Sequence, residues 1–168
     1  MDETEFDRWY DASYPRLVAQ LTALIGNRAE AQDCVQDAFV RAWDRRLDLE
    51  SWAARDAWVR TTAHRLAVSR WRRWRRGQAL GAQAADTQAR LRDATGTDAS
   101  DIRADLLAAI ATLPMPQREA IVLHYLADRS IAQIADELRV AEGTVKARLH
   151  RARAALNAQL NDTTGATP

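Results

Sequence analysis

The segment from residue 128 to residue 156 constrains the fold most, because its apolar residues recur with the period of an α-helix in two successive runs. In the shorter first run, one helix face would carry Ile131, Ile134, Ala135 and Leu138. In the longer second run, one face would carry Val145, Leu149, Ala152 and Leu156. The basic residues are left on the outside of the second helix: Lys146, Arg148, His150, Arg151 and Arg153. Two such helices joined by a tight turn are typical of a helix-turn-helix, whose second helix contacts DNA.

Length, hydropathy and cysteine usage indicate a small protein of the cytoplasm. The chain has 168 residues, which suits one domain or two small ones. No apolar run approaches the roughly 20 residues that cross a bilayer, and the acidic first residues do not resemble a secretory signal. The single cysteine, Cys34, excludes an internal disulfide, and we expect it to be a buried thiol. We therefore expect a cytoplasmic protein with no membrane insertion.

The charge is divided unevenly along the N-terminal half. Residues 1–50 hold eleven acidic and six basic side chains, a balance of −5, whereas residues 51–76 hold eight Arg and one Asp, a balance of +7. Adjacent segments of opposite sign suggest two different partners, one basic and one anionic. A dipolar surface without a partner remains the alternative on charge alone.

The periodic segments predict an all-α fold of two small helical domains. We expect helices that begin near Phe6 and are broken or kinked at Pro15, and then helices over 29–45, 54–76, about 102–110, about 116–126 and the two opening runs. The stretch between the third and fourth helices is rich in Ala, Gln, Thr and Gly, which predicts a flexible linker. The predicted division is a first domain at 1–76, a linker at 77–101, a second domain at 102–160 and a disordered tail at 161–168.

The second predicted helix has a polar face, because Asp33, Asp37, Arg41 and Asp44 recur at helical spacing. Spacing alone favours an ordinary solvated face. However, the run from Asp33 to Trp43 (DCVQDAFVRAW) closely resembles the polymerase-binding segment of bacterial sigma factors. In that family this helix docks on the clamp coiled coil of RNA polymerase. The resemblance therefore implies a polymerase-binding set of Asp33, Gln36, Asp37, Val40 and Arg41.

The third predicted helix continues the resemblance, because the run from Trp58 to Arg76 is similar to the part of sigma that reads and melts the −10 promoter element. Five Arg within residues 70–76 would engage phosphates and make binding depend on salt. In the family, the loop before this helix, here about 45–55, captures a flipped base. Base contact by Trp52 and packing under that loop remain equally open. The implied −10 set is Trp52, Arg60, His64, Arg65, Ser69, Arg72, Arg73 and Arg76.

The resemblance covers residues 5–76 and 105–157, and the chain is similar to the extracytoplasmic function (ECF) group of the sigma-70 family. The helix-turn-helix then resembles region 4, which implies a −35 DNA-binding set of Glu142, Thr144, Lys146, Arg148 and Arg151. Three positions depart from the family pattern: Arg139 stands where Gly is usual in the turn, Ala141 where a capping residue is usual, and Arg65 where Asn is usual.

The resulting hypothesis is a promoter-specificity subunit that directs core polymerase to promoters and assists −10 melting. It implies no catalytic residue, metal or cofactor. It also implies three partners: core polymerase through its clamp coiled coil and its flap, promoter DNA, and an anti-sigma factor. Two other classes stay open. A free-standing helix-turn-helix regulator would need only the C-terminal domain, and a small enzyme would need a polar pocket constellation that the sequence does not reveal.

Overall fold

The computed structural model describes residues 1–45, 51–78 and 101–164, and all its regular elements within these ranges are helical. The chain divides into two compact units, Met1–Asp86 and Thr87–Pro168. The all-α prediction is therefore confirmed. The predicted linker at 77–101 lies largely outside the described residues, so the domain boundaries stay predictions.

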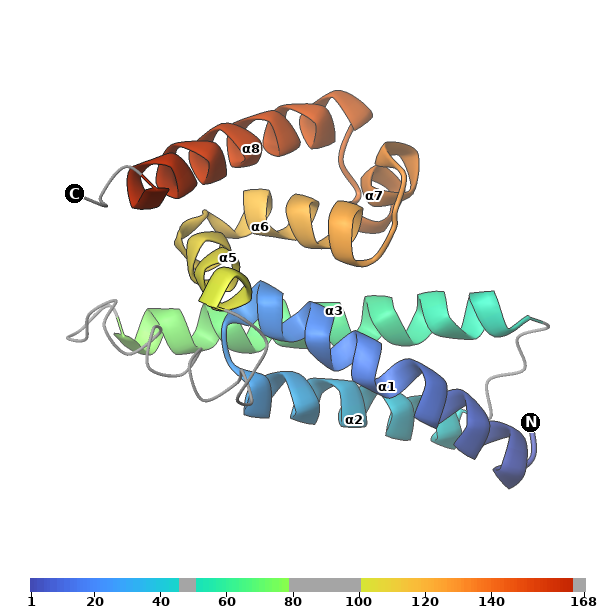
Figure 1. Cartoon of the computed structure of the whole chain (residues 1–168). Coiled ribbons are helices and arrows are strands. Elements are labelled where there is room, and N and C mark those ends of the chain that lie inside the picture. The colour runs from blue at the N-terminus through green and yellow to red at the C-terminus, as the bar shows by residue number, and fades with distance from the viewer. Residues whose placement is uncertain (46–50, 79–100, 165–168) are drawn as a thin grey trace. The chain divides into compact units, whose positions relative to one another are not determined.

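In the described part of the N-terminal unit, residues 1–45 and 51–78, three helices each pack on the other two: α1 (Glu3–Ile25), α2 (Arg28–Asp44) and α3 (Trp52–Gln78) (Figure 1). Local sequence sets the tight connection between the first two. Gly26 ends α1 with φ 71°, a left-handed conformation that costs glycine little. The side chain of Asn27 then accepts a 3.1 Å hydrogen bond from the Glu30 N–H and caps α2.

Aromatic side chains fill the centre of this unit. Trp9 of α1 and Phe39 of α2 are almost fully buried, and their ring centroids lie 4.9 Å apart in an edge-to-face arrangement. Val59, Ala63 and Ala67 present the matching small face of α3 and are wholly buried. The short side chains on α3 let the large rings of the other two helices pack closely against it.

A carboxylate on α3 gathers polar groups from α1. Oδ1 of Asp56 accepts hydrogen bonds from Trp9 Nε1 and Ser13 Oγ, both at 2.7 Å, while its Oδ2 pairs with Arg16. A second ion pair joins Arg55 to Glu5 at 2.5 Å. The ionised carboxylate makes these hydrogen bonds charge-assisted, so they fix the start of α3 against α1.

Two boundary predictions for this unit were wrong. We expected Pro15 to break or kink the first helix, and the break does not occur, because α1 continues through Pro15. Pro15 is exposed, so solvent can satisfy the carbonyl group that loses its helical partner. We also expected Trp52 to lie in a loop, but it is the first residue of α3. Ser51 precedes it, and the Ser51 hydroxyl accepts a 3.2 Å hydrogen bond from the Ala54 N–H, as an N-terminal cap does.

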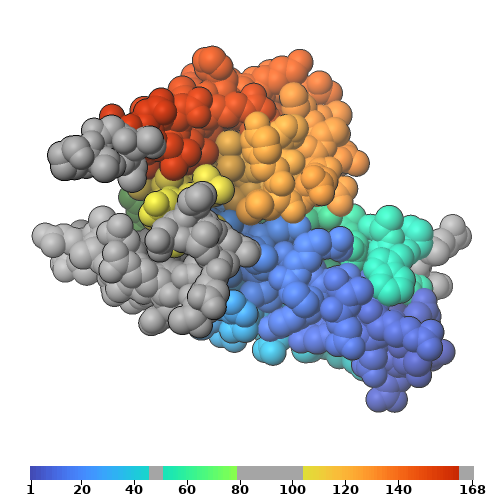
Figure 2. Space-filling view, viewed as in Figure 1, coloured from blue at the N-terminus to red at the C-terminus, as the bar shows by residue number. Residues whose placement is uncertain are grey.

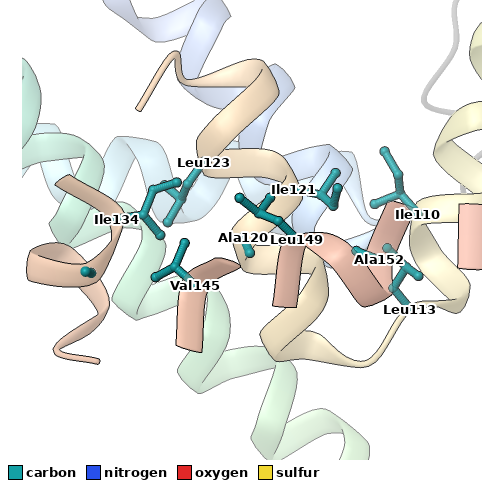
Figure 3. Close-up of a cluster of buried hydrophobic side chains, with 10 residues drawn as sticks. Ile110, Leu113, Ala120, Ile121, Leu123, Ile134, Val145, Leu149 and Ala152 are labelled. Atoms are coloured by element: carbon teal, nitrogen blue, oxygen red, sulfur yellow. The ribbon is translucent and has the colours of Figure 1, made fainter. Parts of the chain in front are cut away.

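Over residues 101–164, the C-terminal unit has four α-helices and one π-helical turn: α5 (Asp101–Thr112), α6 (Met115–Ile121), η1 (Val122–Leu126), α7 (Ile131–Leu138) and α8 (Glu142–Thr164). Its core is a cluster of buried aliphatic side chains in which Ile134 of α7 and Val145 and Leu149 of α8 meet α5, α6 and η1 (Figure 3). The apolar faces predicted for both helices of the helix-turn-helix are therefore the faces that this unit buries. Helix α8 extends to Thr164, so the predicted disordered tail begins inside a helix.

The helix-turn-helix is shaped by one favourable cap and one unfavourable backbone conformation. Ser130 and Gln133 form a reciprocal capping box at the start of α7, with hydrogen bonds of 3.2 and 3.0 Å. Arg139 ends α7 in the left-handed conformation, at φ 55° and ψ 49°. The turn thus has the geometry that usually takes glycine, and this chain adopts it with arginine. Ala141, directly before α8, has no side-chain oxygen to cap that helix.

We predict that Arg139→Gly stabilises the C-terminal unit. A left-handed L-residue costs about 1–2 kcal/mol, and the extra flexibility of glycine in the unfolded chain offsets about half of that. The free energy of unfolding should therefore rise by up to about 1 kcal/mol in urea titrations followed by circular dichroism. Arg151→Gly, at an exposed position inside α8, is the matched control and should lower it by about 1 kcal/mol. Equal losses from both changes would show that the turn is not strained.

Candidate polymerase- and DNA-binding surfaces

The polar face predicted on α2 lies on the outside of the N-terminal unit. Asp33, Gln36, Val40 and Arg41 are exposed, and Asp37 is half-buried. We call these five residues the docking face. The opposite side of α2 is buried in the unit: Ala31, Cys34, Val35, Ala38, Phe39 and Ala42. Val40 keeps 57% of its surface exposed, which is unusual for an aliphatic residue on a helix with a fully packed back.

Aromatic residues that the sequence analysis did not assign border the docking face. Trp43 is 37% exposed, and its ring lies 4.9 Å from that of Phe6. Tyr10 and Tyr14 stack at 4.9 Å on the same helix as Phe6. Burial raises the pKa of the Tyr10 hydroxyl, Tyr14 adds to the rise, and a hydrogen bond with the Gln36 side chain opposes it. Because Gln36 contacts Tyr10, the docking face continues onto α1.

Asp37 of the docking face is tied to α3 by an ion pair. Asp37 forms an ion pair with Arg70 of α3, and the second guanidinium nitrogen of Arg70 lies 3.6 Å from a carboxylate oxygen of Glu30. In the sequence, Arg70 stands out only as part of a run of arginines suited to phosphate. The pairing depends on how α3 crosses α2, so spacing along the chain could not have predicted it.

The predicted −10 set divides into three groups on α3. Arg65, Ser69, Arg72, Arg73 and Arg76 recur at helical spacing and are exposed, so they form one face. Trp52 is 44% exposed, but it lies at the other end of α3, roughly 20 Å along the axis from Arg65. Arg60 and His64 are only 7% exposed each, so the structure does not bring them to the surface with the other six.

The predicted −35 set lies on the outer side of α8, which forms part of the surface of its unit (Figure 2). Glu142, Thr144, Lys146 and Arg151 are exposed and Arg148 is half-buried. Steps of four and three residues put Thr144, Arg148 and Arg151 on one side of the exposed surface, while Glu142 and Lys146 lie on the other. The two sides flank the buried stripe that holds the helix in place.

Arg153, which belongs to none of the predicted sets, is exposed but has a partner on another element of the C-terminal unit. Its Nε donates a 2.7 Å hydrogen bond to the Tyr125 hydroxyl, and its guanidinium lies 5.5 Å from the centroid of the same ring. Tyr125 is itself 53% exposed and belongs to the π-helical turn η1. Arg153 therefore differs from Arg148 and Arg151 in having a fixed side-chain partner on another element.

The described ranges contain neither a cluster of metal-ligand side chains nor a membrane-spanning helix. Over residues 1–45, 51–78 and 101–164, no three His, Cys, Asp or Glu side chains are grouped as metal ligands would be. Among the helices of that part of the chain, none combines the length and the apolar character that a membrane span requires.

Known proteins match this chain along nearly its whole length. Residues 9–77 match the family "Sigma-70 region 2" and residues 103–156 match "Sigma-70, region 4". The ECF RNA polymerase sigma factor SigW of Bacillus subtilis is 31% identical over 158 residues, covering 83% of this chain and 80% of that protein. SigL of Mycobacterium tuberculosis is 32% identical over 155 residues, covering 91% and 87%. The sigma factor RpoE of Bartonella quintana, solved with the anti-sigma factor NepR, superposes with a TM-score of 0.71 at 26% identity, covering 94% of this chain and 97% of that one.

The chain belongs to the sigma-70 family and is an RNA polymerase sigma factor of the ECF type. It directs core polymerase to specific promoters and binds both the polymerase and promoter DNA. Like the rest of its family it is a non-catalytic specificity subunit. The match to region 2 removes the free-standing regulator as an alternative, because such a protein would need only the helix-turn-helix. The family predicted from residues 33–43 and 58–76 is thereby confirmed.

Cys34 yields a prediction about pH. Its side chain is fully buried behind the docking face, and burial raises the pKa of its thiol from 9.0 to about 11. The nearby Arg70 guanidinium lowers the thiol pKa, but by less than burial raises it. Because the folded pKa exceeds the unfolded one, the thiol stabilises the fold fully below about pH 9, and that contribution is lost as pH rises toward 11.

We therefore expect iodoacetamide to modify Cys34 slowly in the folded chain at pH 8 and rapidly in urea at the same pH. Mass spectrometry follows the reaction at this single cysteine without interference from another thiol. Modification of the folded chain at pH 8 as fast as in urea would show that the thiol is not enclosed.

Proposed function

We propose that the docking face of α2 is the surface by which this sigma factor binds the clamp coiled coil of core polymerase. The observation that carries the assignment is the division of α2 into two sides. The apolar side of α2 is buried in the core of the N-terminal unit. Asp33, Gln36, Val40 and Arg41 lie on its other side and are accessible to a partner. Fixed carboxylates would set the register of the contact, and Val40 would supply apolar area.

The exposed arginine face of α3 binds the phosphates of the −10 element in this proposal, and it contributes to opening the duplex there. Arg65, Arg72, Arg73 and Arg76 are suited to this role because they share one accessible face with Ser69. Trp52 offers an exposed indole ring at the opposite end of α3, where it could stack on an unpaired base. Arg60 and His64 support the helix more than the contact, given their burial.

Helix α8 reads the −35 element in the major groove, and α6 with η1 supports docking on the polymerase flap. The five predicted contacts are Glu142, Thr144, Lys146, Arg148 and Arg151. Arg148 and Arg151 are the candidates for bidentate contact with guanine, whereas Lys146 suits phosphate. The proposed division of labour is residues 1–76 for polymerase and −10 contact, 77–101 as connector and 102–160 for −35 contact.

An anti-sigma factor is a further proposed partner, on the basis of the similarity to RpoE, which was solved in complex with one. Such a protein would silence this chain by covering the docking face or α8. The proposed location is the cytoplasm, where bacterial RNA polymerase and promoter DNA are found.

The docking assignment is tested by charge reversal at Asp33. We expect Asp33→Arg to weaken binding to core polymerase about 10-fold or more, since a charge-assisted hydrogen bond contributes about 1.5–3 kcal/mol. Asp105→Arg makes the same charge change at an exposed position on α5 and is the matched control. Fluorescence anisotropy of labelled chain with core polymerase measures both affinities. An equal effect of the two variants would argue against the docking face.

The −35 assignment is tested on α8 itself. Arg148→Ala and Arg151→Ala should each reduce initiation from a promoter with an intact −35 element, by about 1–3 kcal/mol in apparent binding free energy. On a template whose −35 element is scrambled, the same variants should lose far less. Arg153→Ala removes an equal charge from a guanidinium that Tyr125 holds, and we expect it to be nearly neutral. If Arg148→Ala and Arg151→Ala lose equally on both templates, α8 does not read that element.

A further inference from the structure

We propose that Arg70 is a positioning residue for the polymerase contact: it holds Asp37 by one carboxylate oxygen so that the other is presented to the polymerase. This inference rests on the proposed docking role of α2. It gives Arg70 a different task from the exposed arginines that follow it on α3, because its guanidinium faces α2.

The geometry supports a fixed and shared carboxylate. One guanidinium nitrogen of Arg70 pairs with Oδ2 of Asp37, and the other lies 3.6 Å from Oε2 of Glu30. The side chain of Asp37 nevertheless stays 44% exposed, while that of Arg70 is only 30% exposed. A carboxylate accepts at both oxygens, so the pair leaves Asp37 with an acceptor for a donor on the partner.

Repulsion between acidic side chains on α2 explains why a cation is needed to hold Asp37 in place. Glu30, Asp33 and Asp37 lie along one side of the helix at steps of three and four residues, where like charges repel. The planar fork of Arg70 reaches two of the three at once, which a lysine ammonium does less well. Cys34 is fully buried behind this ion pair, and its raised thiol pKa keeps the thiol neutral. The ion pair therefore lies against an uncharged side chain. An ion pair that lies against buried side chains is screened less by water than an ion pair between fully exposed side chains.

The consequence is a difference between two roles that the arginine run could play. A phosphate-binding arginine would change the salt dependence of DNA binding and leave polymerase affinity alone. An arginine that positions Asp37 would change polymerase affinity and leave the salt dependence of DNA binding alone. Polymerase affinity would change because an ordered carboxylate loses less side-chain freedom when the partner binds. We therefore expect Arg70→Gln to weaken binding to core polymerase, in the absence of DNA, by about 3- to 10-fold.

The experiment compares four chains by their affinity for core polymerase: unaltered, Arg70→Gln, Asp37→Asn and the double variant. If Arg70 acts through Asp37, the double variant binds no more weakly than Asp37→Asn alone. Arg75→Gln is the matched control, since Arg75 lies exposed on α3 with its guanidinium 5.2 Å from the Trp71 ring, and it should leave polymerase affinity unchanged. Arg70→Lys keeps the charge but not the fork, and should fall between the unaltered chain and Arg70→Gln.

Thermal unfolding of each variant separates positioning from a general loss of structure. A purely structural role would lower the melting temperature and make the two substitutions additive in polymerase affinity. Additive losses, unchanged affinity in Arg70→Gln, or tighter binding by it would each overturn the inference; tighter binding would mean that Arg70 withholds Asp37.

If Asp33→Arg and Asp37→Asn both leave affinity unchanged, the docking assignment itself fails. If only Arg70→Gln is without effect, the docking assignment stands and the role of Arg70 falls.

Discussion

The packing of α3 against α1 and α2 is the interaction on which the N-terminal unit depends. Small residues on one side of α3 admit the large rings of Trp9 and Phe39. Polar anchors at two places then set the rotation of the helix: Asp56 binds α1 near the start, and Arg70 binds α2 further along. With its rotation set, α3 exposes the arginines of one face, Arg65, Arg72, Arg73 and Arg76, while Arg60 stays buried. A face suited to phosphate thus follows from how the opposite face is packed.

The same logic governs α8 in the C-terminal unit, where the packed stripe is aliphatic. The stripe of Val145, Leu149 and Ala152 is fully enclosed by aliphatic side chains (Figure 3). Removing a buried leucine such as Leu149 leaves a cavity that costs about 2–5 kcal/mol. An exposed arginine on the same helix makes few such contacts. The exposed residues of α8 that would read DNA can therefore be substituted at little cost in stability, whereas the buried stripe that supports them cannot. In this way one scaffold can serve different promoters.

Periodicity in the sequence was sufficient to predict the helical class and the inner and outer faces of α2 and α8. The family was predicted from the resemblance of residues 33–43 and 58–76 to sigma factors. On α3 the predicted faces were right in part, because Arg60 and His64 are buried. Local rules predicted less well when tertiary packing or solvent competed with them. Pro15 was expected to interrupt a helix, but at an exposed site its missing hydrogen bond is tolerated. Trp52 was assigned to a loop because the capping role of Ser51 was not recognised. The link from Arg70 to Asp37 joins residues 33 positions apart, and no short-range pattern encodes such a contact.

The turn of the helix-turn-helix shows how a global constraint overrides a local preference. Arg139 adopts a backbone conformation that favours glycine, and Ala141 precedes α8 without a capping side chain. Each departure costs on the order of 1 kcal/mol, yet the turn keeps its geometry. The buried contacts of Ile134, Val145 and Leu149 exceed these costs, since burying one large aliphatic side chain contributes about 1.5–3 kcal/mol. The relative placement of α7 and α8 is therefore set by the core beneath the turn, and substitutions in the turn should alter stability before they alter DNA recognition.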